Sequence, residues 1–309
     1  MFNLFLQLAK RKKMQKHAYL IIANRNPGQL QTLLTLLDDS RNDIYLLVDR
    51  KSVGYPRDFQ LNYATLFSVS PLIIDWGSYS QIEAEMRLFQ AAAPGKYAYY
   101  HLLSGLDLPL ANQDEIHAFF AAHPGKEFIT YSSLESGAQL LARVQKYHFT
   151  HNFRQPNKAM RLFRKIEKAE QRVFPVRKKF AGTLAFGSNW VSLENDLVQV
   201  LLREDDRIRT MFARGFLVDE LLVPTMLNIY PEFKDRIYYD RPVHDRPEEF
   251  QGNLRYINWW DGSPYVWREK DYETLLAARR QGHLFSRKFD AEVDKAIIDK
   301  IAGQLLEIK

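Results

Sequence analysis

Residues 97–110, YAYYHLLSGLDLPL, carry the pattern that decides the fold. Their first half is aromatic and aliphatic without a charge, which predicts a strand covered on both faces. The strand breaks at Ser104 and Gly105, passes Asp107 and stops at Pro109, which cannot continue a ladder. A buried strand that ends in such a turn is typical of the carboxyl edge of an α/β sheet, where ligands bind. An ordinary core strand, with Asp107 capping the next helix, is the alternative.

Apolar runs of strand length alternate with helical apolar spacings on both sides of this stretch. Further strands are expected at 18–23, 43–48, 72–74, 127–131 and 254–260. Helices are expected at 28–37, 80–92, 113–122, 194–203, 271–280 and 291–307, with more helices within 138–180. This alternation predicts an α/β fold with a mixed, mostly parallel central sheet flanked by helices.

The composition is that of a globular protein long enough to bury a large core. The chain has 309 residues, of which 46% are hydrophobic and 26% charged, and no low-complexity tract is present. It contains no cysteine, which excludes disulfides and thiolate metal sites and fits a reducing cytoplasm.

The net charge of +6 is concentrated in one region of the chain. Such a region suits nucleic acid, anionic lipid or a phosphorylated substrate, and an ordinary solvated helix face is the alternative. Twelve basic residues contribute: Arg143, Lys146, Arg154, Lys158, Arg161, Arg164, Lys165, Lys168, Arg172, Arg177, Lys178 and Lys179.

The amino terminus, MFNLFLQLAKRKK, is too short for a membrane span and lacks a signal-peptide pattern. Its apolar residues followed by basic ones predict a small interfacial anchor within residues 1–17. A start at Met14, with a disordered leader before it, is the alternative.

Several common site motifs are absent from the sequence. No glycine-rich nucleotide loop follows a strand, so dinucleotide and P-loop binding are unsupported. Neither HExxH, D-x-D nor G-x-S-x-G occurs, and His148 and His151 are the nearest histidine pair. Zinc sites and serine hydrolases are therefore disfavoured. Charge alone suggests nucleic acid, but no nucleic-acid-binding motif accompanies it.

The segment VDELLVPTMLN at 218–228 has Asp219 and Glu220 ahead of an apolar helix. Acidic residues at a helix start are favoured by the helix dipole, so capping is the simple interpretation. A glutamate on the wall of a cleft is instead a candidate general base.

Five blocks in order resemble the core-2/I-branching family of glycosyltransferases, which includes β-1,6-N-acetylglucosaminyltransferases and peptide xylosyltransferases. The blocks are AYLIIANRNP, IYLLVDRKS, YYHLLSGLDLPL, FGSNWVSL with VDELLVPTMLN, and LRYINWW through LFSRKFD. They run from Ala18 to about residue 294, and the lack of cysteine resembles the bacterial members.

The resemblance implies a GT-A-like fold and an inverting, metal-independent transfer from a UDP-sugar. The lack of D-x-D agrees with a family in which cationic side chains replace the diphosphate-binding metal. It implies a nucleotide-sugar half at 18–135 and an acceptor-binding, catalytic half of the same domain at 136–309.

The resemblance also assigns roles to individual residues. Glu220 falls on the catalytic base, and Lys288 on the lysine that neutralises the leaving diphosphate. Arg268 is the candidate for the arginine that partners Lys288. Trp259 matches an acceptor-stacking tryptophan, and Asp49 lies where the nucleotide is expected.

Arg143 and Lys146 match a basic pair at the sugar site. The implied donor is a UDP-sugar. The leading expectation is the transfer of GlcNAc in a β-1,6 linkage. UDP-galactose, UDP-glucose and UDP-xylose are the alternative donors. The non-enzyme alternative is a non-catalytic glycan-binding or scaffold relative. The presence of both Glu220 and Lys288 disfavours it.

The implied acceptor is a glycan or lipid-linked oligosaccharide in surface or capsular polysaccharide synthesis. The protein is expected in the cytoplasm, with peripheral contact to the anionic inner face of the membrane. No metal, cofactor or nucleic-acid partner is expected.

Overall fold

The structure is a computed structural model. It describes residues 16–56, 58–132, 137–148, 158–173, 183–241 and 245–307. The predicted 1–17 leader therefore lies outside the described residues up to residue 15, and His17 already belongs to the first strand.

A five-stranded sheet organises the chain, in the order β3-β2-β1-β4-β8. The first four strands are mutually parallel, and the short β8 is antiparallel to β4. The strands are β1 (His17–Ala23), β2 (Asn42–Asp49), β3 (Thr65–Leu72), β4 (Tyr99–Ser104) and β8 (Ser192–Glu194). The predicted mixed, mostly parallel sheet is confirmed.

Two smaller sheets contain the other described strands. Parallel β9 (Arg255–Ile257) and β10 (Phe285–Arg287) join antiparallel β5 (Leu108–Pro109), while β6 (Tyr131–Ser132) pairs with β7 (Phe186–Gly187). Each of these three sheets combines strands from both predicted halves, 18–135 and 136–309.

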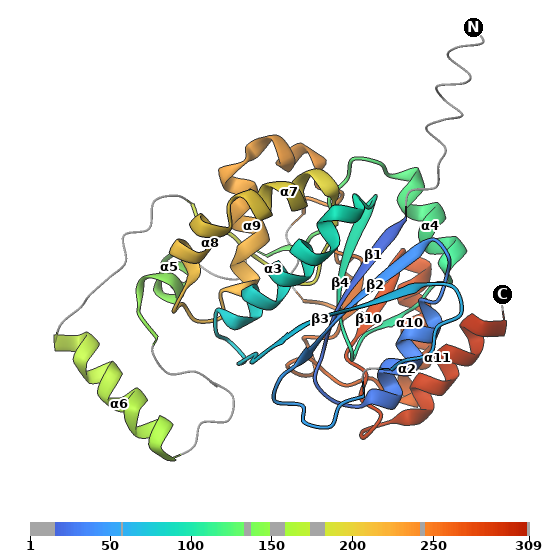
Figure 1. Ribbon diagram of the computed structural model, residues 1–309, viewed down its shortest axis with the longest axis horizontal. Coiled ribbons are helices and arrows are strands. Elements are labelled where there is room, and N and C mark those ends of the chain that lie inside the picture. The colour runs from blue at the N-terminus through green and yellow to red at the C-terminus, as the bar shows by residue number, and fades with distance from the viewer. Residues whose placement is uncertain are drawn as a thin grey trace, which may run out of the picture.

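Helices cover both faces of the central sheet, as Figure 1 shows. The alternation along β1 explains this, because Leu20 faces one apolar core while Tyr19 and Ile21 face the other. The first core includes residues of α3 (Ser80–Ala92), α7 (Asn195–Arg203), α8 (Asp205–Phe212) and α9 (Asp219–Ile229). The second includes residues of α2 (Pro27–Leu36), α4 (Gln113–Ala122), α10 (Tyr272–Gln281) and α11 (Lys295–Glu307).

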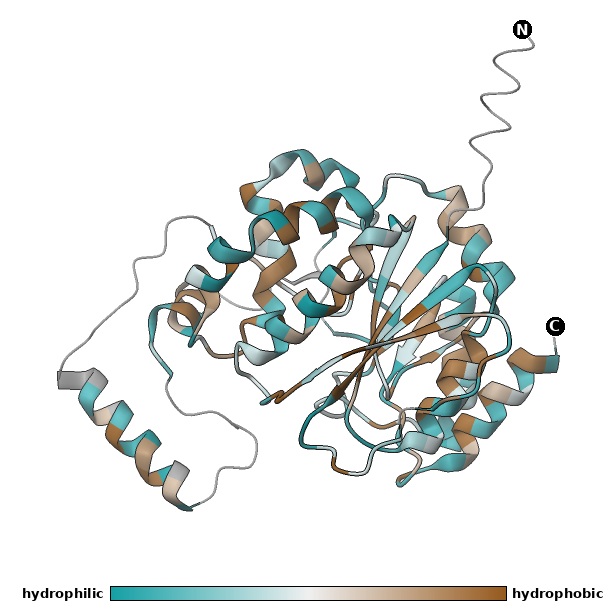
Figure 2. Cartoon of the chain, in the orientation of Figure 1, coloured by the Kyte–Doolittle hydropathy of each residue, from teal (hydrophilic) through white to brown (hydrophobic). Residues whose placement is uncertain are grey.

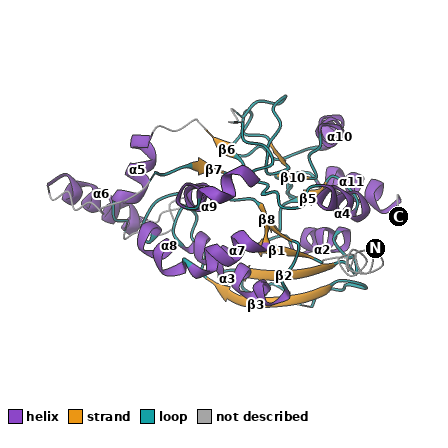
Figure 3. Cartoon of the chain, turned by 90° about the horizontal axis from the view of Figure 1, so that it is seen from above, coloured by secondary structure: helices purple, strands orange, loops and turns teal. Residues whose placement is uncertain are grey.

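In the described segments, the other helices are α5 (Gly137–Gln145) and α6 (Lys158–Val173), with short 3₁₀ segments η1 (Ala93–Gly95), η2 (Pro231–Arg236) and η3 (Glu269–Asp271). Figure 1 shows α6 apart from the helices that cover the sheet, and in the view from above in Figure 3 it lies at one end of the molecule, on the side of α5.

Three predicted strands were wrong in detail, and the one expected at 254–260 is the three-residue β9. The strand expected at 72–74 is β3, which ends at Leu72 instead. It forms an edge of the sheet and is half exposed, so polar Ser68 and Ser70 interrupt the apolar run on which the prediction relied. The strand expected at 127–131 is reduced to isolated bridges at Glu127 and Phe128, followed by β6.

Candidate active site

A cavity of about 420 Å³ lies where α9, β7, β9, β10 and the segment after β3 converge. Three residues singled out from the sequence, Glu220, Trp259 and Lys288, all line it. Their neighbours in the lining include Trp76, Gln81, Asn189, Trp190, Asp219, Asn253 and Arg287. The cavity thus brings together a carboxylate, cations and indole faces from segments spread between residues 76 and 288 of the sequence.

Glu220 is the second residue of α9, and its side chain is 27% exposed. Arg143 of α5 donates to its Oε2 over 2.8 Å and to the carbonyl of Leu217 over 3.0 Å. The Arg143 guanidinium also lies 5.1 Å from the centre of the Phe186 ring. These contacts hold the Glu220 carboxylate in one orientation while leaving part of it open to the cavity. The sequence placed Arg143 at the sugar site; here it contacts the predicted base.

Asp219, the first residue of α9, is buried beside Glu220. Gln81 donates to its Oδ2 over 2.8 Å, and its Oδ1 has no hydrogen-bond partner. Burial, and then the charge of Glu220, raise the pKa of Asp219 to about 7. Burial and the charge of Asp219 likewise raise the pKa of Glu85, which accepts a hydrogen bond from Asn189 over 3.2 Å. Two buried carboxyl groups with raised pKa values, Asp219 and Glu85, therefore lie on the protein side of Glu220.

This burial predicts a pH-dependent stability. An unfolded chain loses the Asp219 proton near pH 4, whereas the folded chain keeps it to about pH 7. Unfolding therefore releases a proton in this window, and stability falls as pH rises by about 1.4 kcal/mol per pH unit. Asp219→Asn removes this loss of stability at high pH and keeps an acceptor for the Gln81 hydrogen bond.

We expect Asp219→Asn to be more stable than the parent at pH 8, with the gain shrinking toward pH 4. Chemical denaturation at several pH values measures it, with the exposed Asp206→Asn as the matched control. A difference that stays constant across pH would contradict the prediction.

The cationic side of the cavity comes from the end of β10. Arg287 lies with its guanidinium 4.1 Å from the centre of the Trp190 ring, and its Nε is 3.6 Å from Asp107 Oδ1. Its Nε and Nη1 are buried without a hydrogen-bond partner. Burial lowers the pKa of Arg287, and Asp107 opposes that effect. A planar cation with unmatched donors is suited to bind an anion.

Asp107 connects these cations to the central strand. Its carboxylate accepts from the Ser104 backbone N–H over 3.0 Å and from the Ser104 hydroxyl over 2.6 Å. The turn after β4 therefore holds the carboxylate that lies beside Arg287. Asp107 orders the edge of the cavity from a fully buried position, so its role in this structure is to hold the turn and Arg287.

Three more residues predicted from the sequence, Arg268, Lys146 and Asp49, lie outside the lining of this cavity. Arg268 is exposed at the start of η3, and Lys146 is exposed just after α5. Asp49 ends β2 and is buried, and its Oδ1 accepts from the backbone N–H of Lys51 over 3.0 Å. Trp259 is 39% exposed and lines the cavity.

Sequence reasoning did not assign Arg287 to the site, although Phe285 and Phe289 flank Arg287 and Lys288 in the sequence. Both phenylalanines are fully buried. Only the packing of β10 shows that Arg287 as well as Lys288 reaches the cavity.

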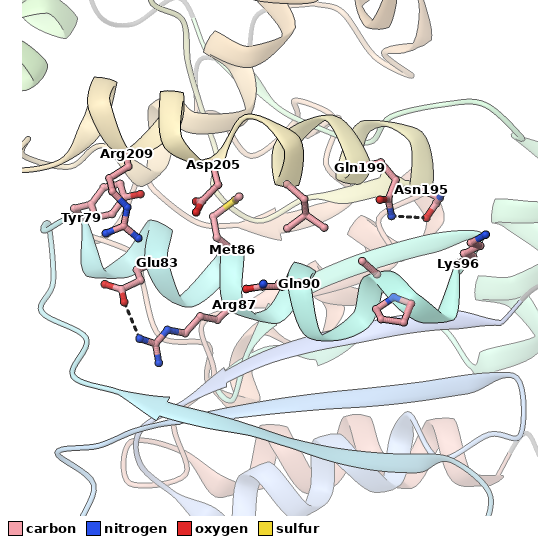
Figure 4. A pocket seen from close by; sticks show the side chains of 13 residues that line it. Tyr79, Glu83, Met86, Arg87, Gln90, Lys96, Asn195, Gln199, Asp205 and Arg209 are labelled. Atoms are coloured by element: carbon pink, nitrogen blue, oxygen red, sulfur yellow. Dashed lines mark hydrogen bonds and ion pairs between the residues drawn. The ribbon is translucent and has the colours of Figure 1, made fainter.

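A larger cavity, of about 910 Å³, lies between α3 and the α7–α8 pair. Figure 4 shows its lining, in which Arg87 pairs with Glu83 over 2.8 Å and Gln199 donates to Asn195 over 3.3 Å. Within the described part of the chain, none of the site residues predicted from the sequence lines it. The smaller cavity is therefore the candidate active site.

Within the described ranges, no group of three or more His, Asp or Glu side chains is arranged to hold a metal ion. No helix in the part of the chain that the structure describes is long and apolar enough to cross a membrane.

Comparisons with known proteins indicate a family. The family model described as Core-2/I-Branching enzyme matches residues 17–275, which is most of the chain. No curated protein matches. Among solved structures, mouse xyloside xylosyltransferase 1 in its apo form is similar over 88% of this chain and 96% of that one. Its sequence identity is 13% and its TM-score 0.36, a likeness too low to carry a functional argument.

Proposed function

The chain belongs to the Core-2/I-branching enzyme family, and we propose that it is an inverting glycosyltransferase that uses a UDP-sugar. Membership of this family indicates a glycosyltransferase with a sugar donor and a glycan acceptor. The observation that carries the proposal further is the shared cavity, where Glu220 and the pair Arg287 and Lys288 contribute to one lining. A base and an anion-binding pair are what a single displacement at a sugar carbon needs.

In the proposed reaction, Glu220 takes the proton of an acceptor hydroxyl. The freed oxygen forms a bond to the anomeric carbon from the face opposite the leaving group. The bond from that carbon to the diphosphate oxygen breaks, and its electron pair leaves with UDP. Because negative charge develops on the diphosphate during this step, Lys288 and Arg287 stabilise the transition state more than the ground state. Configuration at the anomeric carbon is inverted by this geometry.

Trp259 is proposed to bind the acceptor, because a partly exposed indole on the cavity wall offers a flat surface for the face of a sugar ring. Arg143 is proposed to position Glu220 through their 2.8 Å ion pair. Cationic side chains are proposed in place of a diphosphate-bound metal. Asp49 stays a proposal for nucleotide binding; it accepts from the backbone N–H groups of Lys51 and Ile74 and lies 3.6 Å from the Lys51 ammonium.

GlcNAc in a β-1,6 linkage is the first proposed transfer, with galactose, glucose and xylose as the other sugars. The acceptor is proposed to be a glycan or lipid-linked oligosaccharide of a bacterial surface or capsular polysaccharide. We place the protein in the cytoplasm, peripheral to the inner face of the membrane.

The test of function is a UDP-release assay of the purified chain against UDP-GlcNAc, UDP-galactose, UDP-glucose and UDP-xylose, with EDTA present. We expect release from one donor above the others, and a plain UDP-induced rise in melting temperature. A strict requirement for Mn²⁺ would contradict the metal-independent part of the proposal. No release together with no stabilisation by UDP would contradict the donor class.

A further inference from the structure

Helix α6 presents a large apolar surface to solvent. Leu162, Phe163 and Ile166 are 60%, 64% and 53% exposed. Figure 2 shows apolar segments along α6, and Figure 1 shows the helix apart from the body of the protein. Three exposed apolar side chains within one and a half turns are a contiguous patch rather than the scattered exposure usual on soluble proteins.

The same helix separates its apolar residues from its basic ones. Leu162, Ile166 and Ala169 recur at steps of four and three, so they share one face. The basic residues Lys158, Arg161 and Lys165 recur at steps of three and four on a different face. The helix sequence contains six basic and two acidic residues: Lys158, Arg161, Arg164, Lys165, Lys168 and Arg172 against Glu167 and Glu170.

From this arrangement we infer that α6 docks in the plane of an anionic membrane surface, inserting Leu162, Phe163 and Ile166 at the headgroup boundary. A short helix with a charged face and an apolar face of Leu, Ile and Phe fits that environment. Its sixteen residues are too few and too charged to span a bilayer. The phosphates of a nucleic acid would pair with its cations but leave the apolar face in water.

The position of α6 in the chain connects this surface to the cavity. α6 follows α5, which carries Arg143, and precedes β7, whose Phe186 and Gly187 line the cavity. A docked α6 therefore tethers both segments to the bilayer, where a lipid-linked acceptor resides. Only this last consequence rests on the proposed function, because docking is measured without donor or acceptor.

The first experiment measures binding of the full chain to vesicles. One set is pure phosphatidylcholine, and the other contains equal parts of phosphatidylcholine and phosphatidylglycerol. We expect binding to the anionic vesicles only, weakened by salt. The triple variant Leu162→Ser/Phe163→Ser/Ile166→Ser is expected to bind about a hundredfold more weakly.

A matched triple variant controls for loss of exposed apolar surface in general. Val53→Ser/Tyr63→Ser/Leu306→Ser removes side chains that are 95%, 67% and 41% exposed elsewhere, and we expect it to bind as the parent does. Replacing Lys158 and Lys165 by Gln is expected to weaken anionic binding by roughly fivefold per charge.

The second experiment locates the contact on the helix. Because the chain has no cysteine, a single Cys introduced at Ile166 or at Arg164 carries an environment-sensitive fluorophore at one known position. These positions lie on opposite sides of α6. We expect a blue shift with anionic vesicles for the label at 166 and little change for the label at 164.

Equal binding to both vesicle types would overturn the inference, and so would full binding by the Leu162/Phe163/Ile166 variant, which would place the contact elsewhere in the chain. Self-association of the parent that is lost in that variant, without vesicle binding, would show that the face joins two copies. A circular dichroism spectrum and a melting temperature like those of the parent show that each variant is folded.

Discussion

Glu220→Gln is expected to reduce sugar transfer by about a thousandfold while leaving the affinity for UDP nearly unchanged. Glutamine keeps the shape of the side chain, and its amide oxygen still accepts the Arg143 hydrogen bond seen at 2.8 Å. It does not accept a proton at neutral pH, so the acceptor hydroxyl loses its base. The affinity for UDP depends on the cationic side of the cavity and is expected to persist.

Initial transfer rates with the preferred donor, together with calorimetric titration of UDP, separate the two quantities for this variant. Glu83→Gln is the matched control, since Glu83 is a glutamate of α3 paired with Arg87 on the lining of the other cavity. A Gln variant that transfers sugar at the parent rate would reject Glu220 as the base. A variant that loses UDP binding as well would indicate a role in building the site.

Arg287→Ala is expected to lower the transfer rate by about a hundredfold and to weaken UDP binding. Arg287 lines the cavity, stacks on Trp190 and has two buried nitrogens without a hydrogen-bond partner. Its removal takes away one of two cations at the end of β10. Arg287→Lys keeps the charge but loses the planar stack, so an intermediate loss is expected.

Arg268→Ala is the matched comparison, because the family resemblance placed the partner of Lys288 at Arg268 and the structure places that residue on the exposed edge of η3. We expect Arg268→Ala to change transfer little. The UDP-induced shift in melting temperature and the transfer rate are measured for each arginine variant. Loss in Arg268→Ala with full activity in Arg287→Ala would reverse the assignment.

Local patterns predicted most of the regular structure correctly because those segments are buried on the faces that their periodicity indicates. β1 and α4 were predicted to within one residue, and α4 has a complete capping box at Asn112 and Glu115. β3 was misplaced because no residue of this edge strand is buried, so its apolar signal is weak. α8 was not predicted as a separate helix, since few apolar residues mark it.

The amino-acid sequence by itself determined the fold class, the family resemblance, and the candidates Glu220, Lys288 and Trp259. These depend on local order along the chain, where periodicity and motif spacing are visible. Tertiary structure decided which charges meet: Arg143 against Glu220, Asp107 against Arg287, and the buried Asp219 behind the base. Such contacts join residues up to 180 positions apart. Their burial and separation follow from packing across the sheets, which no local pattern specifies.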